Sequence, residues 1–182
     1  MQRLAQSKVW RVFALLFVVG ISIGIFLIPA EQVARFQGYG YAGLFLVSLI
    51  AYATVFIPAP DALIVFSMGA HLPPLGVALA AGSGAAIGEL SGYLAGLGGQ
   101  VVIENSPIYK AMVAWMNRNG PLTVFVAAAI PSPFFDLAGI SAGALRMPVL
   151  KFLLFCWLGQ LIKMFLIALA GSGLISIPWL RP

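Results

Sequence analysis

The sequence has 182 residues, of which 62% are hydrophobic and only 8% are charged, and its mean hydropathy is +1.04. Soluble domains carry roughly one-quarter charged residues, so the composition excludes a soluble domain and predicts an all-α integral membrane protein with one membrane domain over 1–182. The formal net charge of +5 suits anionic lipid headgroups and not nucleic acid, because no basic run is interleaved with aromatic residues. A single cysteine excludes an internal disulfide, and we expect no metal or other cofactor.

The first apolar run, 12–28, predicts an N-terminal transmembrane helix. A cleavable signal peptide has the same basic start and apolar middle, but Ile28-Pro29-Ala30-Glu31 makes a poor cleavage site, so we expect the helix to be retained. The basic residues before it, Arg3, Lys8 and Arg11, place the N-terminus in the cytoplasm by the positive-inside rule.

The next segment, 41–73, is apolar but is interrupted by Pro58 and Pro60. Each proline removes a backbone donor and clashes with the preceding turn, so a straight helix is not expected here. Two interpretations stay open: one long helix with a proline kink, or a re-entrant hairpin in which two half-helices meet at the prolines. Open backbone at membrane depth is tolerated only where protein covers it or where it lines water.

A spanning helix is predicted over 75–99, and it is suited to burial among other helices. Glycines that recur at every fourth position allow another helix to approach closely. They are Gly84, Gly88, Gly92 and Gly96. Glu89 lies in the later half of this helix, one turn before Tyr93.

The segment 100–120 is the most polar interior stretch of the chain. After Pro107, apolar residues recur at helical spacing opposite Lys110 and Arg118. This pattern predicts a short helix in the membrane interface, with Trp115 at the level of the headgroups. A solvated loop is the alternative.

The pattern of the earlier hairpin then returns. A second re-entrant hairpin is predicted over 121–147, because Pro131 and Pro133 break its apolar sequence. A second spanning helix is predicted to follow it, over 149–177.

The two hairpins align as a repeat. Asp61 and Asp136 each precede a closing proline, Pro73 or Pro148, by twelve residues. One spanning helix separates the hairpins, so they would open to opposite sides of the membrane, as in the inverted repeats of secondary transporters. Basic residues agree with this topology: seven fall on the side predicted to be cytoplasmic and two on the other. We expect the protein to lie in the cell (inner) membrane. By this topology the C-terminus would be on the outer side of that membrane.

Three of the five carboxylates, Asp61, Glu89 and Asp136, lie inside apolar stretches beside residues that break helices. An ionised acid is costly at bilayer depth, so such residues usually face a cavity, a partner or a proton path. We predict that they bind substrate or protons, and that Lys163 or Arg146 supplies the cation that a phosphate needs. Two structural interpretations stay open, namely Asp61 as a helix cap and Glu89 as an ion-pair partner of Lys163.

Three motifs in these segments combine proline, glycine and acidic residues. They are Pro58-Ala59-Pro60-Asp61, Gly88-Glu89-x3-Tyr93-x2-Gly96-x2-Gly99 and Pro131-Ser132-Pro133-Phe134-Phe135-Asp136. Together they resemble the VTT-domain membrane proteins of the DedA and SNARE-associated Golgi protein superfamily. The resemblance covers roughly 41–171.

The resemblance implies two re-entrant hairpins that face each other and that move lipids or lipid-linked phosphates between leaflets. The lipid is undecaprenyl phosphate in bacterial members and phospholipid in eukaryotic relatives, and coupling to protons through acids of the first hairpin is implied as well. Bacterial DedA proteins carry arginines in the second hairpin, but 127–135 contains none. The sequence therefore resembles the TVP38-like branch more closely.

These observations predict a lipid transporter of the scramblase or flippase kind, with membrane lipid and protons as its partners. A small ion or metabolite transporter on the same fold is one alternative, and a non-transporting membrane scaffold is another. We expect no enzyme, because the sequence holds no nucleophile motif, metal-ligand cluster or phosphate loop. A homo-oligomer stays open.

Overall fold

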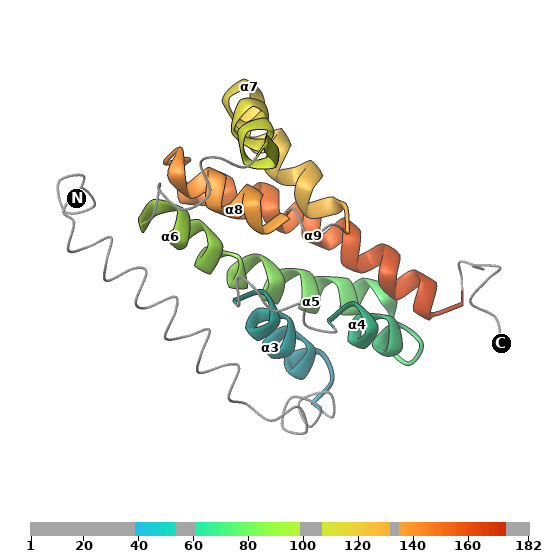
Figure 1. Ribbon diagram of the computed structural model, residues 1–182. Helices are drawn as coiled ribbons and strands as arrows, with labels where there is room; N and C mark the ends of the chain where they lie inside the picture. The colour runs from blue at the N-terminus through green and yellow to red at the C-terminus, as the bar shows by residue number, and fades with distance from the viewer. Residues whose placement is uncertain (1–38, 54–60, 99–106, 132–134, 174–182) are drawn as a thin grey trace.

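The structure is a computed structural model, and it describes residues 39–53, 61–98, 107–131 and 135–173. In these ranges every helix or strand is an α-helix, from α3 to α9 (Figure 1). The predicted N-terminal helix at 12–28 lies outside the described residues, and so do the predicted helix breakers Pro58, Pro60 and Pro133.

Two separate helices, α3 and α4, occupy the segment expected to form the first hairpin. α3 covers Gly40–Ala53 and α4 covers Asp61–Gly69. The side chains of Ser48 and Asp61 are hydrogen-bonded, although a straight helix would separate them by about 20 Å along its axis. α3 and α4 are therefore not parts of one straight helix, which agrees with the prediction from the two prolines.

α5 and α6 follow each other as one rod (Figure 1). α5 covers Pro74–Gly88 and α6 covers Leu90–Gly98, with Glu89 between them. The hydrogen bonds continue through this junction, because the Glu89 N–H donates to the carbonyl oxygen of Ala85 at 3.0 Å. The combined rod is long and apolar enough to span a membrane.

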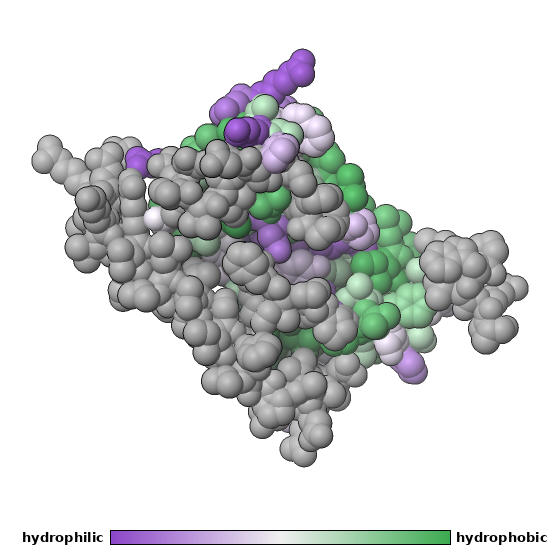
Figure 2. All heavy atoms as spheres, in the orientation of Figure 1, coloured by the Kyte–Doolittle hydropathy of each residue, from purple (hydrophilic) through white to green (hydrophobic). Residues whose placement is uncertain are grey.

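α7 covers Pro107–Ala129 and bends at Asn119, where the backbone is not helical. The Asn119 side chain accepts a hydrogen bond from the Leu122 N–H at 3.3 Å, so it caps the second half, whose first turn tolerates Pro121. The half before the bend is amphipathic, because Met112 is buried while hydrophilic side chains gather over the outer end of α7 (Figure 2). A helix is therefore confirmed here, and the solvated-loop interpretation is wrong.

α8 covers Phe135–Ala144 and α9 covers Val149–Gly171. Pro131 is exposed and non-helical just after α7, so α7 and α8 are separate helices. α9 is the second candidate membrane span in the described part of the chain, and it packs along α5 (Figure 1).

Glycines allow the helices to approach each other closely. α3 lies along α5, where a Cβ at Gly84 or Gly88 would overlap the α3 backbone. α8 lies along α6 in the same way, with Gly96 against the carbonyl group of Ile140. The four-residue glycine spacing is therefore confirmed as a helix-packing surface.

α9 is packed by the same means at its C-terminal end and along its middle. α4 crosses its C-terminal end, where Gly171 lies against the carbonyl group of Phe66. α7 lies along its middle, where Gly159 lies against the carbonyl group of Phe125. Without a Cβ at these two positions, the backbones can touch directly.

Equivalent packing glycines are 75 positions apart. This separation relates Gly84 to Gly159 and Gly96 to Gly171. The first pair packs against the first helix of each half, α3 or α7, and the second pair packs against a short helix from the other half, α8 or α4. Each long rod therefore carries one helix of its own half and one of the other half.

Two apolar clusters form the core of the described residues, and polar side chains lie between them. On α9, Cys156 belongs to one cluster and Met164 to the other, while the fully buried Gln160 lies between them on the same face. On the opposite rod, Glu89 lies between residues of the two clusters in the same way. The middle of the core is therefore polar.

Candidate functional site

A layer of polar side chains from α3, α4, α8, α9 and the α5–α6 junction crosses the middle of the core. We call it the polar layer, and its members are Ser48, Tyr52, Asp61, Glu89, Asp136, Gln160 and Lys163. Five of them are buried, and even the long side chain of Lys163 is only 6% exposed. Burial of charged groups is costly unless they are paired, so this layer is unlike ordinary packing.

Asp61 is the first residue of α4, and its side chain connects that helix to α3. The hydroxyl of Ser48 donates a hydrogen bond to Asp61 Oδ1 at 2.7 Å. The second oxygen, Oδ2, is buried and has no hydrogen-bond partner among the described residues. Asp61 therefore bonds to a neighbouring helix at Oδ1 and keeps one oxygen open.

Lys163 projects from α9 between aromatic rings of both halves. Its Nζ donates a hydrogen bond to the hydroxyl of Tyr52 at 3.1 Å and lies 4.9 Å from the centre of that ring. It also lies 5.7 Å from the centre of the Phe135 ring, within the reach of a cation–π interaction. Tyr52 lies near the end of α3, and Phe135 is the first residue of α8. Lys163 therefore contacts a helix from each of the two segments predicted to form hairpins.

Lys163 is the shared cation of the three acids. It interacts electrostatically with Asp61, Glu89 and Asp136, but it forms an ion pair with none of them in the described part of the chain. The interpretation of Glu89 and Lys163 as a direct ion pair is therefore wrong. One ammonium group shared by three carboxyl groups cannot neutralise all of them when they are ionised.

Glu89 lies at the junction of α5 and α6 and points toward α8. Its Oε2 would be 3.6 Å from a Cβ on Gly92 and 3.5 Å from a Cβ on Gly139. These two glycines therefore leave room for the carboxyl group between α6 and α8. Its other oxygen, Oε1, is buried without a hydrogen-bond partner among the described residues.

Asp136 is the second residue of α8 and is only partly buried, unlike Asp61. It lies close enough to Glu89 for the two carboxyl groups to interact electrostatically. No hydrogen bond is found for its side chain in the part of the chain that the structure describes. The three predicted acids are thus brought together, each in a different environment.

Arg146 is not part of the polar layer. It is exposed in the turn between α8 and α9, where its backbone has a φ of 54°. The next residue, Met147, accepts a hydrogen bond from the hydroxyl of Tyr93, which ties this turn to α6. Of the two predicted cations, the structure therefore brings only Lys163 to the acids.

Three members of the polar layer were not predicted as site residues, namely Ser48, Tyr52 and Gln160. Ser48 and Tyr52 are four residues apart in an apolar helix, so they share one face. That pair is a usable signal, because two polar side chains on one face of a membrane helix need a polar neighbour. Gln160 and Lys163 are three residues apart in α9, so they also share a face.

The polar layer has hydrogen-bonding groups that its own members leave unused. Gln160 is fully buried, and both its Oε1 and its Nε2 lack a partner among the described residues, as do one oxygen of Asp61 and one of Glu89. Unused buried donors and acceptors usually bond to water or to a ligand. Within the described residues, no group of three acidic, histidine or cysteine side chains could hold a metal ion.

The fold and this site define an all-helical membrane protein with a charged layer inside its core. The family model of the VTT domain matches residues 57–173, which is most of the chain. The chain therefore belongs to the VTT-domain family, that of the DedA and SNARE-associated Golgi proteins. No curated protein and no solved structure matches the sequence.

Proposed function

We propose that this protein moves lipids or lipid-linked phosphates between membrane leaflets and couples this movement to protons. The polar layer is the observation that carries the proposal. Asp61, Glu89 and Asp136 share Lys163 in the middle of an apolar core, where ionisable residues are costly and usually mark a substrate or proton path.

We also propose that the two halves form inverted repeats, each with a re-entrant hairpin. The 75-position separation that relates the packing glycines also relates Asp61 to Asp136. Because the single rod of α5 and α6 separates the two predicted hairpins, the second half would have the opposite orientation in the membrane. The N-terminus would be cytoplasmic in the cell (inner) membrane, and the lack of arginine at 127–135 favours the TVP38-like branch.

The acids and the helix ends together provide a mechanism. Asp61 and Asp136 lie in the first turns of α4 and α8, where the helix dipole and free backbone N–H groups attract an anion. An ionised aspartate occupies such a position itself, whereas a protonated one leaves it to a substrate phosphate. Lys163 is the cation that such a phosphate would meet, since Arg146 lies outside the layer.

The proposal predicts lipid exchange that depends on pH. Purified protein in liposomes should exchange a fluorescent lipid phosphate between leaflets faster at acid than at neutral pH. Asp61→Asn and Asp136→Asn should weaken this pH dependence, because an amide cannot ionise. Glu104→Gln, which changes an acid in the polar stretch 100–120, is the matched control. An unchanged rate and pH profile in both aspartate variants would refute the mechanism.

The same liposomes separate the alternatives. A small ion or metabolite transporter would give solute flux without leaflet exchange of the fluorescent lipid. A scaffold would give neither, and the acid-to-amide changes would then alter only stability. We propose no enzymatic step, and the intact substrate should be recovered after exchange.

A further inference from the structure

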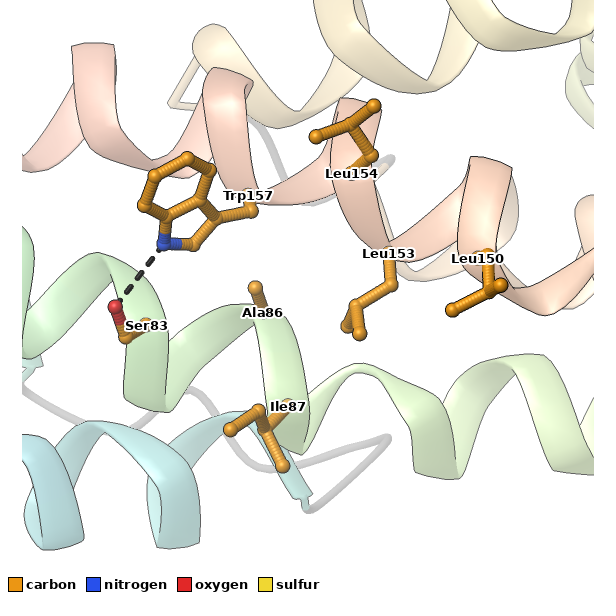
Figure 3. A pocket seen from close by; sticks show the side chains of 7 residues that line it. All are labelled: Ser83, Ala86, Ile87, Leu150, Leu153, Leu154 and Trp157. Atoms are coloured by element: carbon orange, nitrogen blue, oxygen red, sulfur yellow. Dashed lines mark hydrogen bonds between the residues drawn. The ribbon is translucent and has the colours of Figure 1, made fainter.

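An open groove lies between α5 and α9. It has a volume of about 550 Å³, which is within the range of roughly 300–1,000 Å³ usual for ligand pockets. Its walls come from two helices, as Figure 3 shows. They are Ser83, Ala86 and Ile87 from α5, and Leu150, Leu153, Leu154 and Trp157 from α9.

The surroundings of the groove indicate what covers it. On α9, large apolar side chains are exposed at every fourth position. They are Leu150, Leu154, Leu158, Ile162 and Leu166. Because α9 is a candidate membrane span in a membrane protein, this stripe faces hydrocarbon chains, and the groove opens beside it.

The wall of the groove is fixed by one polar contact. The Trp157 Nε1–H donates a hydrogen bond to the Ser83 hydroxyl at 3.0 Å, which links α9 to α5 and holds the indole in place (Figure 3). Every other lining residue is apolar. The groove is therefore a preformed apolar surface with a fixed aromatic wall.

The groove comes close to the polar layer at one of its ends. Ala86 precedes Glu89 by one helical turn, and it lies toward the end of the groove where Leu150 and Leu153 line α9 (Figure 3). A molecule that lay in the groove would therefore have one end near the unused Oε1 of Glu89. A lipid, with an apolar chain and a polar head, has this shape.

We infer that the groove holds one hydrocarbon chain of a membrane lipid and directs the polar end of that lipid toward the polar layer. Its role in transport rests on the proposed function, whereas binding of the chain rests on the groove. Lipid tails are as apolar as leucine, so retention of the chain must come from close packing against a concave surface. The part of the stripe outside the groove, Leu158, Ile162 and Leu166, offers fewer contacts and should exchange its chains freely.

Trp157 can report on this binding by its fluorescence. The chain has four tryptophans, so Trp10→Phe, Trp115→Phe and Trp179→Phe leave Trp157 as the only reporter. Purified protein in detergent is titrated with phosphatidylglycerol that carries bromine on its acyl chains, which quenches a nearby indole. A reference protein also carries Trp157→Phe, and its only tryptophan is introduced by Leu166→Trp, on the part of the stripe that lies outside the groove. Quenching at position 157 should reach a plateau while quenching at position 166 still rises with the lipid.

Two groove variants and one matched control test the location. Leu154→Gln places an amide at the groove, and Leu166→Gln makes the same change on the same stripe at 51% rather than 52% exposure. Leu154→Gln should move the half-saturation of Trp157 quenching to several-fold more lipid, and Leu166→Gln should leave it unchanged. Ala86→Leu fills the groove and should have an effect in the same direction. If Ala86→Leu does not fold, the comparison of Leu154→Gln with Leu166→Gln still tests where the lipid chain binds.

Parallel quenching curves at the two positions would overturn the inference, and so would groove variants that leave the Trp157 curve unchanged. Leaflet exchange measured on the same proteins separates this failure from failure of the proposed function. A plateau at Trp157 in a protein that exchanges no lipid would support chain binding and refute transport. Exchange without a plateau would refute the groove and leave transport standing.

Discussion

Asp61 in the first half and Asp136 in the second are 75 positions apart, yet their surroundings differ. Asp61 is buried and bonded to Ser48 of α3, whereas Asp136 is partly buried and has no comparable bond in the described residues. The packing glycines of the two halves, in contrast, make equivalent contacts. The packing of the helices is therefore alike in the two halves, whereas the hydrogen bonding and burial of each aspartate depend on its own neighbouring side chains.

The missing bond has a local explanation. Gly84 packs against Phe45 and Leu49 of α3, and Gly159 packs against the corresponding positions of α7, of which the second is Ala129. By this register, Ala128 in α7 stands where α3 has Ser48. An alanine has no hydroxyl to donate, so the second half lacks the side chain that holds the acid of the first.

The largest effect on folding stability is expected at Lys163, the cation that acids of both halves share. Lys163→Met removes the shared cation from three acids, and removal of one partner from a buried charge network typically costs about 3–5 kcal/mol of folding free energy. Thermal unfolding in detergent measures the loss. Lys151→Met, an exposed lysine on the same helix, should change stability by no more than about 0.5 kcal/mol. Equal effects of the two variants would show that the layer does not depend on Lys163.

The equivalence of the two halves can be tested at Gly96 and Gly171. An added methyl group at either would overlap a backbone carbonyl group, so each alanine variant should lose about 1–3 kcal/mol. Similar losses are expected if the halves pack alike. Gly120→Ala is the control, since the nearest atom to its Cβ would be Met147 Sδ at an ordinary 3.8 Å. A loss at only one of the two sites would break the equivalence.

The difference between the halves can be tested at Ser48. Ser48→Ala leaves Asp61 without its hydrogen bond, and loss of a bond to a charged group costs about 1.5–3 kcal/mol. The pH profile of lipid exchange should then come closer to one set by two unbonded aspartates. Ser67→Ala, at an exposed position of α4, is the control for the loss of a hydroxyl. A stable variant with an unchanged profile would mean that the bond does not distinguish the acids.

The smallest effect is expected at the contact between the two rods. Trp157→Phe keeps most of the aromatic wall and removes only the hydrogen bond to Ser83, which is worth about 0.5–1.5 kcal/mol. Chemical unfolding in detergent can resolve a change of this size. Trp115→Phe, at a side chain that is 63% exposed, should leave stability unchanged. A greater loss at Trp115 would place the stabilising contact elsewhere.

Much of the helix pattern could be predicted from the sequence, because prolines and glycines act locally. The closing prolines, Pro73 and Pro148, directly precede α5 and α9, and the amphipathic spacing after Pro107 is a helix as predicted. The predicted span 75–99 is matched by the continuous rod of α5 and α6. The place of the Glu89 carboxyl group between the glycines of α6 and α8 could not be predicted, because it depends on which helix packs there.

The site could be predicted only in part. Rare acids in apolar sequence stand out, so Asp61, Glu89 and Asp136 were found, and so was Lys163. Arg146 was placed with them because a phosphate needs a cation, but the turn after α8 leaves its side chain exposed. Ser48, Tyr52 and Gln160 were missed as members of the site, because serine, tyrosine and glutamine are common in helices and gain their meaning from what they face.

The sequence by itself determined that this is an all-helical membrane protein of the VTT-domain family, and which residues would be costly to bury in it. Its hydropathy, its helix-breaking residues and its small-residue spacing are properties of neighbouring residues, and they can be read along the chain. Only the tertiary structure decided that one lysine serves three acids and that the two aspartates differ. Those facts depend on which helices touch, since α4 and α8 each pack on a rod of the other half and bring together residues far apart in the sequence.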